Sequence, residues 1–178
     1  MPRLRQIKLI LILVAVILTI QIPMHFSSFA SSEQKTDVHK FTLYCNISQT
    51  LKDAIHKDEL IGRGMDEAKK ILKSNTKNSA KWDANPYYFV QSTKSLIDHL
   101  LHEQKNTTSL SLTQSTFCSN KAEKAEALNT VSWLLLIHHE NSVQESKKDH
   151  KSAIESALDE LKLIAKRNHI STEAPELF

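Results

Sequence analysis

A dense apolar stretch in the second half of the chain places the strongest constraint on the fold. Of the seven residues from Val131 to Ile137 only Ser132 is polar, and no Gly or Pro stands near them. A bilayer span takes about 20 apolar residues, so this stretch is too short to cross a membrane. A helix that is apolar around most of its circumference normally packs against several others. The stretch therefore predicts the central helix of a helical bundle.

The composition favours an all-α fold around this helix. The chain has 178 residues, enough for one domain with a sizeable core, and it contains 2 Gly and 4 Pro. So few turn-forming residues are untypical of β architectures. We therefore predict a single-domain bundle of four main helices plus one short helix, tied by one disulfide. Apolar periodicity places the helices at residues 38–61, 65–74 (the short one), 85–104, 121–140 and 143–168.

Local signals set the first helix boundaries. Both glycines of the chain occur at Gly62 and Gly64, and their permissive backbone predicts the end of the first helix or a kink there. Asn85 followed by Pro86 predicts a helix start, with Asn as the N-cap and Pro at the first helical position.

Two further starts follow from capping-box patterns, in which a polar cap precedes Glu by three residues. Asn120 with Glu123 predicts the start of the central helix, and Ser142 with Glu145 predicts the start of the last one. The apolar stripe also changes phase between these two helices. We therefore expect a break near Asn141.

The charge balance argues against nucleic-acid binding. The formal net charge is +3, but three of the 23 Lys and Arg precede the apolar N-terminal run. The remaining 20 match the 20 Asp and Glu, so the rest of the chain has no global field that would attract phosphates. One local basic stretch is consistent with a solvated helix face plus loop, or with a docking patch for an acidic partner. It comprises Arg63, Lys69, Lys70, Lys73, Lys77 and Lys81.

The N-terminus has the pattern of an export signal over residues 1–30. A basic start precedes the 14-residue run Leu9–Ile22, and small residues follow up to Ala30, where we expect cleavage. Retention of the run as a signal anchor is the alternative. Both predict that residues 31–178 form an exported helical domain, periplasmic or secreted, or membrane-anchored and facing out.

The two cysteines predict a disulfide. Cys45 and Cys118 form an even pair, which in an oxidising compartment is most simply one bridge. It would close a loop of roughly 73 residues, for which the chain-entropy estimate is about 4 kcal/mol. A catalytic Cys paired with a His is the alternative, but the sequence has no local signature for it.

Nine histidines raise the question of a metal site. If the last two helices form a hairpin, His138 or His139 could approach His150, with Glu140 or Glu145 as an acidic ligand. Such a set suits zinc or copper. No established metal motif is present, and the alternative is that His138 is a hydrogen-bonded histidine at the edge of the core.

No catalytic or cofactor motif is apparent. Phosphate-binding loops, nucleophile elbows and haem-attachment motifs are all missing from the sequence. Asn106 lies in a glycosylation triplet that would matter in a eukaryotic host. We therefore expect a non-enzymatic exported protein without a cofactor, which binds another macromolecule, as an inhibitor, immunity or exclusion factor does. The alternatives are a His-based metal-binding protein and a membrane-anchored component of an envelope assembly.

Overall fold

The computed structural model describes residues 37–74, 82–105, 118–144 and 147–172. The chain divides into two compact units, Met1–Lys40 and Phe41–Phe178. The second unit contains the hydrophobic core. The predicted signal segment and the loop with Asn106 lie outside the described residues.

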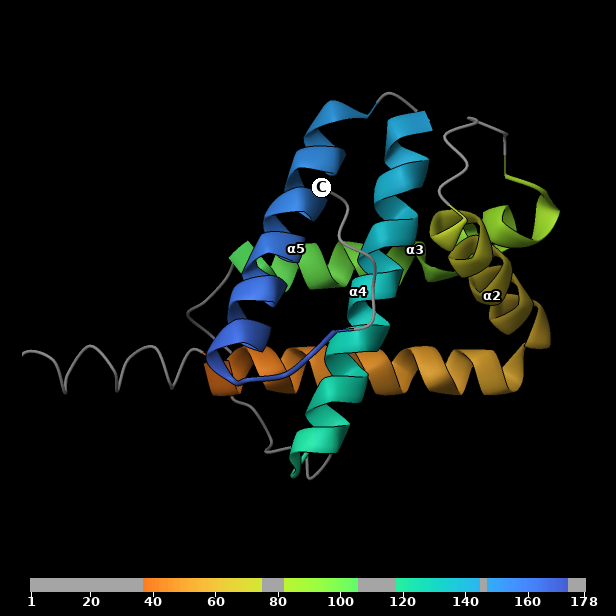
Figure 1. Cartoon of the computed structure of the whole chain (residues 1–178). Coiled ribbons are helices and arrows are strands. Elements are labelled where there is room, and N and C mark those ends of the chain that lie inside the picture. Colours follow the sequence, from red (N-terminus) through yellow and green to blue (C-terminus); the bar gives the residue numbers. More distant parts are fainter. Residues whose placement is uncertain (1–36, 75–81, 106–117, 145–146, 173–178) are drawn as a thin grey trace, which may run out of the picture. The chain divides into compact units, whose positions relative to one another are not determined.

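The described residues form five helices and no strand, which confirms the predicted all-α bundle (Figure 1). The first covers residues 37–57 and crosses the boundary between the two units. The others are α2 Glu59–Lys73, α3 Ala84–Lys105, α4 Lys121–Gln144 and α5 Lys148–Arg167. Within this part of the chain no helix is long and apolar enough to cross a membrane.

The central position predicted for the apolar stretch is confirmed by its burial. Every residue from 131 to 139 is buried, and Val131, Leu134 and Leu135 have no exposed surface. Helix α4 contacts α2, α3 and α5, while α2 packs mainly on α3 and α5 packs mainly on α4. A helical stretch that is buried on all sides needs apolar residues around its circumference, and residues 131–137 supply them except at Ser132.

The first helix ends earlier than predicted, and the two glycines do not end it. Asp58 separates residues 57 and 59 in an extended conformation and caps α2, its carboxylate accepting a hydrogen bond from the amide of Leu60 at 3.0 Å. Gly62 and Gly64 then lie inside α2. The prediction was wrong because a cap residue can start a new helix at once, and such a start outweighs the flexibility of glycine a few residues later.

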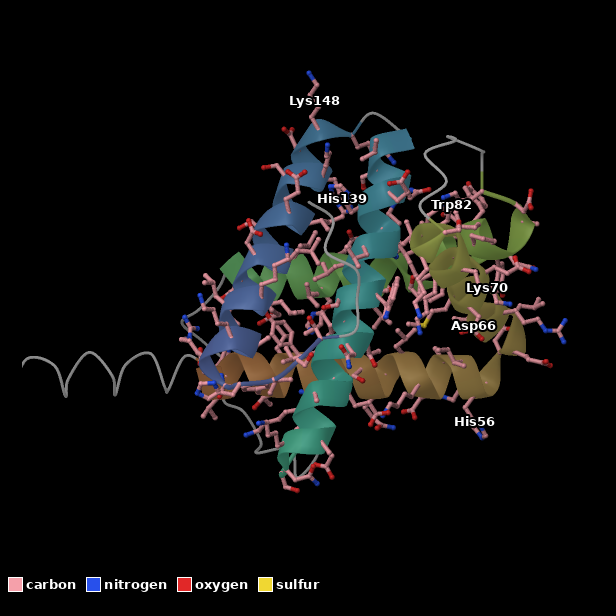
Figure 2. All side chains as sticks on the ribbon, viewed as in Figure 1. His56, Asp66, Lys70, Trp82, His139 and Lys148 are labelled. Atoms are coloured by element: carbon pink, nitrogen blue, oxygen red, sulfur yellow. A yellow bond between two sulfur atoms is a disulfide. The ribbon has the colours of Figure 1, made fainter. Side chains whose placement is uncertain are left out.

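Gly64 has a packing role instead. A Cβ atom on Gly64 would overlap the backbone carbonyl oxygen of Asn85 and would lie 2.8 Å from the Cβ of Phe89. The absence of a side chain therefore lets α2 approach the start of α3 closely. Asp66 and Lys70 occupy the exposed side of α2 (Figure 2).

Two predicted caps are wrong. Helix α3 begins at Ala84, before Asn85, whose side-chain amide donates a hydrogen bond to Glu67 at 3.2 Å. Helix α4 continues to Gln144 through Ser142, whose hydroxyl bonds to the carbonyl of His138 at 2.9 Å. Asn85 finds its partner through the packing of α3 on α2, whereas Ser142 bonds back to its own helix, an alternative to capping that serine adopts inside helices.

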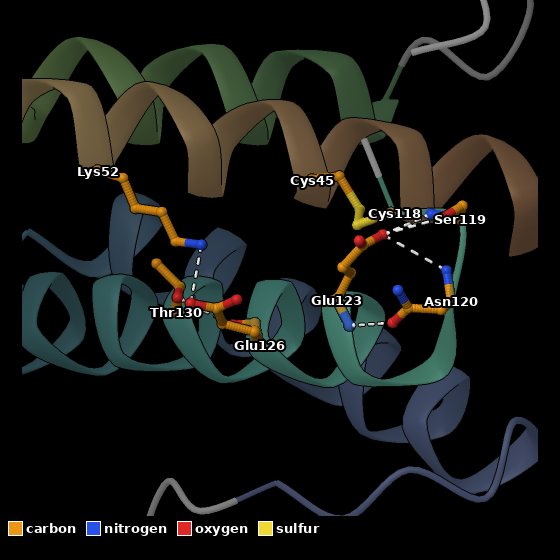
Figure 3. Close-up of a disulfide and its surroundings, with 8 residues drawn as sticks. All are labelled: Cys45, Lys52, Cys118, Ser119, Asn120, Glu123, Glu126 and Thr130. Atoms are coloured by element: carbon orange, nitrogen blue, oxygen red, sulfur yellow. Dashed lines mark hydrogen bonds and ion pairs between the residues drawn. A yellow bond between two sulfur atoms is a disulfide. The ribbon is translucent and has the colours of Figure 1, made fainter. Parts of the chain in front are cut away.

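The capping box at the start of α4 is confirmed (Figure 3). Asn120 accepts a hydrogen bond from the amide of Glu123 at 2.9 Å, and Glu123 accepts bonds from the amides of Asn120 and Ser119 at 3.4 and 2.7 Å. These backbone hydrogen bonds, from Asn120 first, lower the pKa of the Glu123 carboxyl below its ordinary value.

The predicted disulfide is also confirmed. Cys45 and Cys118 are bonded, with their Cα atoms 6.2 Å apart, inside the usual range (Figure 3). The bridge ties the first helix to the start of α4. A second tie between the same helices is the ion pair of Lys52 and Glu126, whose atoms are 2.8 Å apart.

Candidate functional site

His138 lies at the edge of the core and is 4% exposed. Its Nε2 is 2.9 Å from the hydroxyl oxygen of Thr93, and that hydroxyl lies 2.7 Å from the carbonyl oxygen of Phe89. Since the carbonyl can only accept, the single hydroxyl proton of Thr93 goes to Phe89, and His138 donates from Nε2 to Thr93. This is the hydrogen-bonded core-edge histidine of the alternative interpretation.

His139 contacts a different partner. Its Nε2 lies 3.1 Å from a carboxylate oxygen of Glu155 on α5, and Lys151 lies 3.7 Å from the same oxygen. The hydrogen bond from His139 lowers the pKa of the Glu155 carboxyl, partial burial opposes the effect, and the charge of Lys151 lowers the pKa further. Among the described residues, the buried Nδ1 of His139 has no hydrogen-bond partner.

His138 and His150 share a pocket of about 290 Å³. It opens where the end of α4 and the start of α5 face α3, and we call it the three-helix pocket. Its charged and polar lining includes Lys94, Asp98, His138, Asn141, Lys147 and His150.

The structure therefore brings together two of the three histidines singled out in the sequence. His139 does not line the three-helix pocket and faces Glu155 instead (Figure 2 labels His139). No group of three metal-ligating side chains occurs in the part of the chain that the structure describes. Consecutive helical residues point about 100° apart, so His138 and His139 serve different neighbours.

The basic stretch on α2 has partners that the sequence did not indicate. The ammonium groups of Lys69 and Lys73 lie 5.7 and 5.4 Å from the ring centroid of Trp133, which is 4% exposed. Arg63 pairs with Glu59 at 2.8 Å. These contacts tie much of the described stretch to α2 and to the α2–α4 packing, as expected of a structural helix face.

A different surface presents large apolar side chains to solvent. Leu60 at the start of α2 is 47% exposed, and Tyr87 and Tyr88 at the start of α3 are 52% and 39% exposed. The hydroxyl of Tyr88 donates to the carboxylate of Asp58 at 2.6 Å, and the other oxygen of that carboxylate accepts from the amide of Leu60. One carboxylate thus joins the two helix starts, and its hydrogen bond raises the pKa of the Tyr88 hydroxyl.

We call Leu60, Tyr87 and Tyr88 the tyrosine surface. Sequence reasoning did not single it out, because the neighbouring Phe89 and Val90 carry the apolar periodicity of this helix and are buried. The available signal is the tyrosine pair just outside the apolar stripe. Exposed tyrosines cannot be assigned from periodicity alone, since Tyr is common both inside and outside proteins.

Comparisons with protein-family models, curated proteins and solved structures find no match to the chain.

Proposed function

We propose that this protein acts outside the cytoplasm, without catalysing a reaction, by binding another protein through the tyrosine surface. The observation that carries the proposal is the exposure of Leu60, Tyr87 and Tyr88 at the adjoining starts of α2 and α3. Tyrosine is enriched at protein interfaces and among the residues that dominate binding energy. Inhibitors and immunity or exclusion factors are proteins of this kind.

The hydrogen bond from Tyr88 to Asp58 strengthens the case for Tyr88 as an anchor. An exposed side chain normally loses rotamer freedom when a partner immobilises it, which costs about 0.5–1.5 kcal/mol. Tyr88 is already held at 2.6 Å by a carboxylate that also caps α2. Part of the rotamer freedom of Tyr88 is therefore already lost before a partner binds.

The proposed compartment is supported by the disulfide. Disulfides persist in secreted and periplasmic proteins and are rare in the cytosol. Both cysteines of the chain are used in the Cys45–Cys118 bridge. The signal pattern in residues 1–30 agrees with this compartment.

Site-specific photo-crosslinking tests the proposed interface. A photoreactive phenylalanine analogue replaces Tyr87 in the full chain, expressed in its own cells. The matched control carries the analogue at Leu163, an exposed apolar residue on α5 that is 55% exposed. We expect one discrete adduct from position 87 that is absent from position 163 and is weakened by Tyr88→Ala. Identical adducts from both positions, or none from position 87, would contradict the proposal.

The intact mass of the protein in membrane and soluble fractions tests the compartment. We expect a soluble species that begins at Ser31 and gains the mass of two hydrogens on reduction. A full-length species confined to the membrane would instead support the membrane-anchored alternative, with Leu9–Ile22 as the anchor.

Metal binding is the second candidate, because His138 and His150 line one pocket. Zinc or copper would need a further ligand there, and Asp98 is the carboxylate in the lining. Stoichiometric metal in the purified protein, lost on changing His138, His139 and His150 to Ala, would favour this function over the first. A metal content that is unchanged in the triple variant would exclude it.

A further inference from the structure

The three-helix pocket collects hydrogen-bond donors and positive charge from three helices. Lys94 comes from α3, Asn141 from the last turn of α4, and Lys147 and His150 from the start of α5. Asp98, one turn after Lys94, is the only acidic residue among the described residues of the lining. A volume of about 290 Å³ suits a small molecule rather than a peptide.

The buried polar side chains of the pocket lining already have hydrogen-bond partners within the protein. His138 donates from Nε2 to Thr93, and Ser142 donates to the carbonyl of His138 at 2.9 Å. The more exposed groups of the lining differ. Within the described residues, the side chains of Lys94, Asn141 and His150 make no hydrogen bond or ion pair, so their donors are available to a ligand.

The start of α5 adds a second reason for an anion at this place. Its N-cap is Lys147, which makes no side-chain capping bond. A helix N-terminus carries a partial positive charge, so a cation there is unfavourable and an anion is favourable. The acidic residue in the first turn, Asp149, does not line the pocket. An anion in the pocket would complement the helix end.

We propose that the three-helix pocket binds a small organic anion through its carboxylate or phosphate group. Lys94 supplies the charge, and Asn141 and His150 supply directed donors from two other helices. Asp98 faces the same space and weakens the binding of a simple anion, while it can accept a bond from a hydroxyl or amino group on a larger ligand. This site is separate from the tyrosine surface, and the inference does not rest on the proposed partner.

Isothermal titration with inorganic phosphate and with succinate, at constant ionic strength, tests the proposal. We expect saturable millimolar binding of at least one probe to the full chain. Binding of phosphate alone indicates a phosphorylated ligand, and binding of succinate alone indicates a carboxylate. Amide shifts confined to the pocket would place the bound probe. The absence of saturable binding of both probes would overturn the proposal.

Three single variants are expected to have three different effects on the affinity for the probe, which tests whether binding is specific to the pocket. Lys94→Gln should weaken binding about tenfold, whereas Asp98→Asn should strengthen it by several-fold, because the first removes an attraction and the second a repulsion. Lys70→Gln, an exposed lysine on α2, is the matched control for loss of one charge and should leave binding unchanged. Equal weakening in Lys94→Gln and Lys70→Gln would show that net charge alone attracts the probe, and the proposal would fail.

Discussion

Gly64 sets how closely α2 approaches α3. A methyl group at this position would overlap the carbonyl oxygen of Asn85, which is backbone and cannot rotate away. We expect Gly64→Ala to lower the free energy of unfolding by about 2–3 kcal/mol, because the helices must separate and expose apolar surface between them. Urea unfolding followed by circular dichroism measures the change.

Gly62 offers a matched control in the same helix. Among the described residues, a Cβ there would meet the Cγ2 methyl of Ile55 at 3.0 Å, a side-chain contact that a shift of a few tenths of an ångström relieves. Alanine is favoured over glycine in a helix by up to about 1 kcal/mol, so Gly62→Ala should be neutral or stabilising. Equal losses in the two variants would show that backbone flexibility, and not close packing, explains both glycines.

Glu155 gives the fold a pH dependence with a definite sign. Its hydrogen bond from His139 lowers its pKa in the folded state, so the folded protein binds fewer protons at this group than the unfolded chain does. The contribution to stability is therefore complete above the ordinary Glu pKa of about 4.3 and is lost as the pH falls through the lowered value. Glu155→Gln should remove this part of the acid sensitivity.

Unfolding midpoints in urea from about pH 2 to about pH 7 test the expectation. The difference in unfolding midpoint between the wild type and Glu155→Gln should become smaller toward the acid end of the range. Ser156→Ala, an exposed change on the same helix without a titrating group, should run parallel to the wild type throughout. A constant difference between the wild type and Glu155→Gln at every pH would contradict the linkage.

At the scale of the helices, the residue that follows the C-cap of α5 has an unfavourable backbone conformation. His169 has φ 52°, in the left-handed region that favours glycine. The amide of His169 donates to the carbonyl of Lys166 at 3.2 Å. The amide of Ile170 donates to the carbonyl of Ala165 at 2.9 Å. This pair of bonds is the Schellman arrangement, in which the residue after the cap is usually Gly.

His169→Gly should therefore stabilise the protein by about 0.5–1 kcal/mol, since it removes the strain without changing the two capping bonds. His169→Ala keeps the strain and should give no gain, so it separates the backbone effect from loss of the imidazole. Thermal unfolding resolves a shift of this size. A gain in the Ala variant equal to that in the Gly variant would assign the effect to the side chain.

The helices could be predicted from the sequence more reliably than their ends. Periodicity and burial repeat over many residues, so the apolar stretch of α4 indicated its central place correctly. A cap depends on a single contact, so two similar capping-box patterns gave different outcomes. Asn120 caps α4 as predicted, whereas Ser142 lies inside α4, where its hydroxyl bonds to the carbonyl of His138.

Across the whole molecule, residues distant in sequence were the least predictable. The last two helices are neighbours, as the predicted hairpin requires, and His138 and His150 line one pocket between them and α3. A short connection makes consecutive helices neighbours. The Tyr88–Asp58 and Thr93–His138 bonds join residues 30 and 45 positions apart. No local pattern encodes such pairs, since they depend on how α2, α3 and α4 pack.

The disulfide is the feature whose loss should affect the whole molecule. Cys45 and Cys118 lie 73 residues apart, and the chain between them includes α2 and α3. Without the bridge the unfolded chain regains the freedom of that loop, so Cys45→Ala with Cys118→Ala should lower the free energy of unfolding by about 4 kcal/mol. The native packing should change little, because the Lys52–Glu126 pair also joins the first helix to α4.

Urea unfolding of the double variant and of the reduced wild type should give the same loss, because both lack the same covalent constraint. An undiminished free energy in the double variant would contradict the prediction. Typical domains have only about 5–15 kcal/mol of net stability. A loss of about 4 kcal/mol would thus remove a large part of the stability of the chain in a reducing compartment. The tyrosine surface and the three-helix pocket, each assembled from separate helices, would then be formed in a smaller fraction of the molecules wherever the disulfide is reduced.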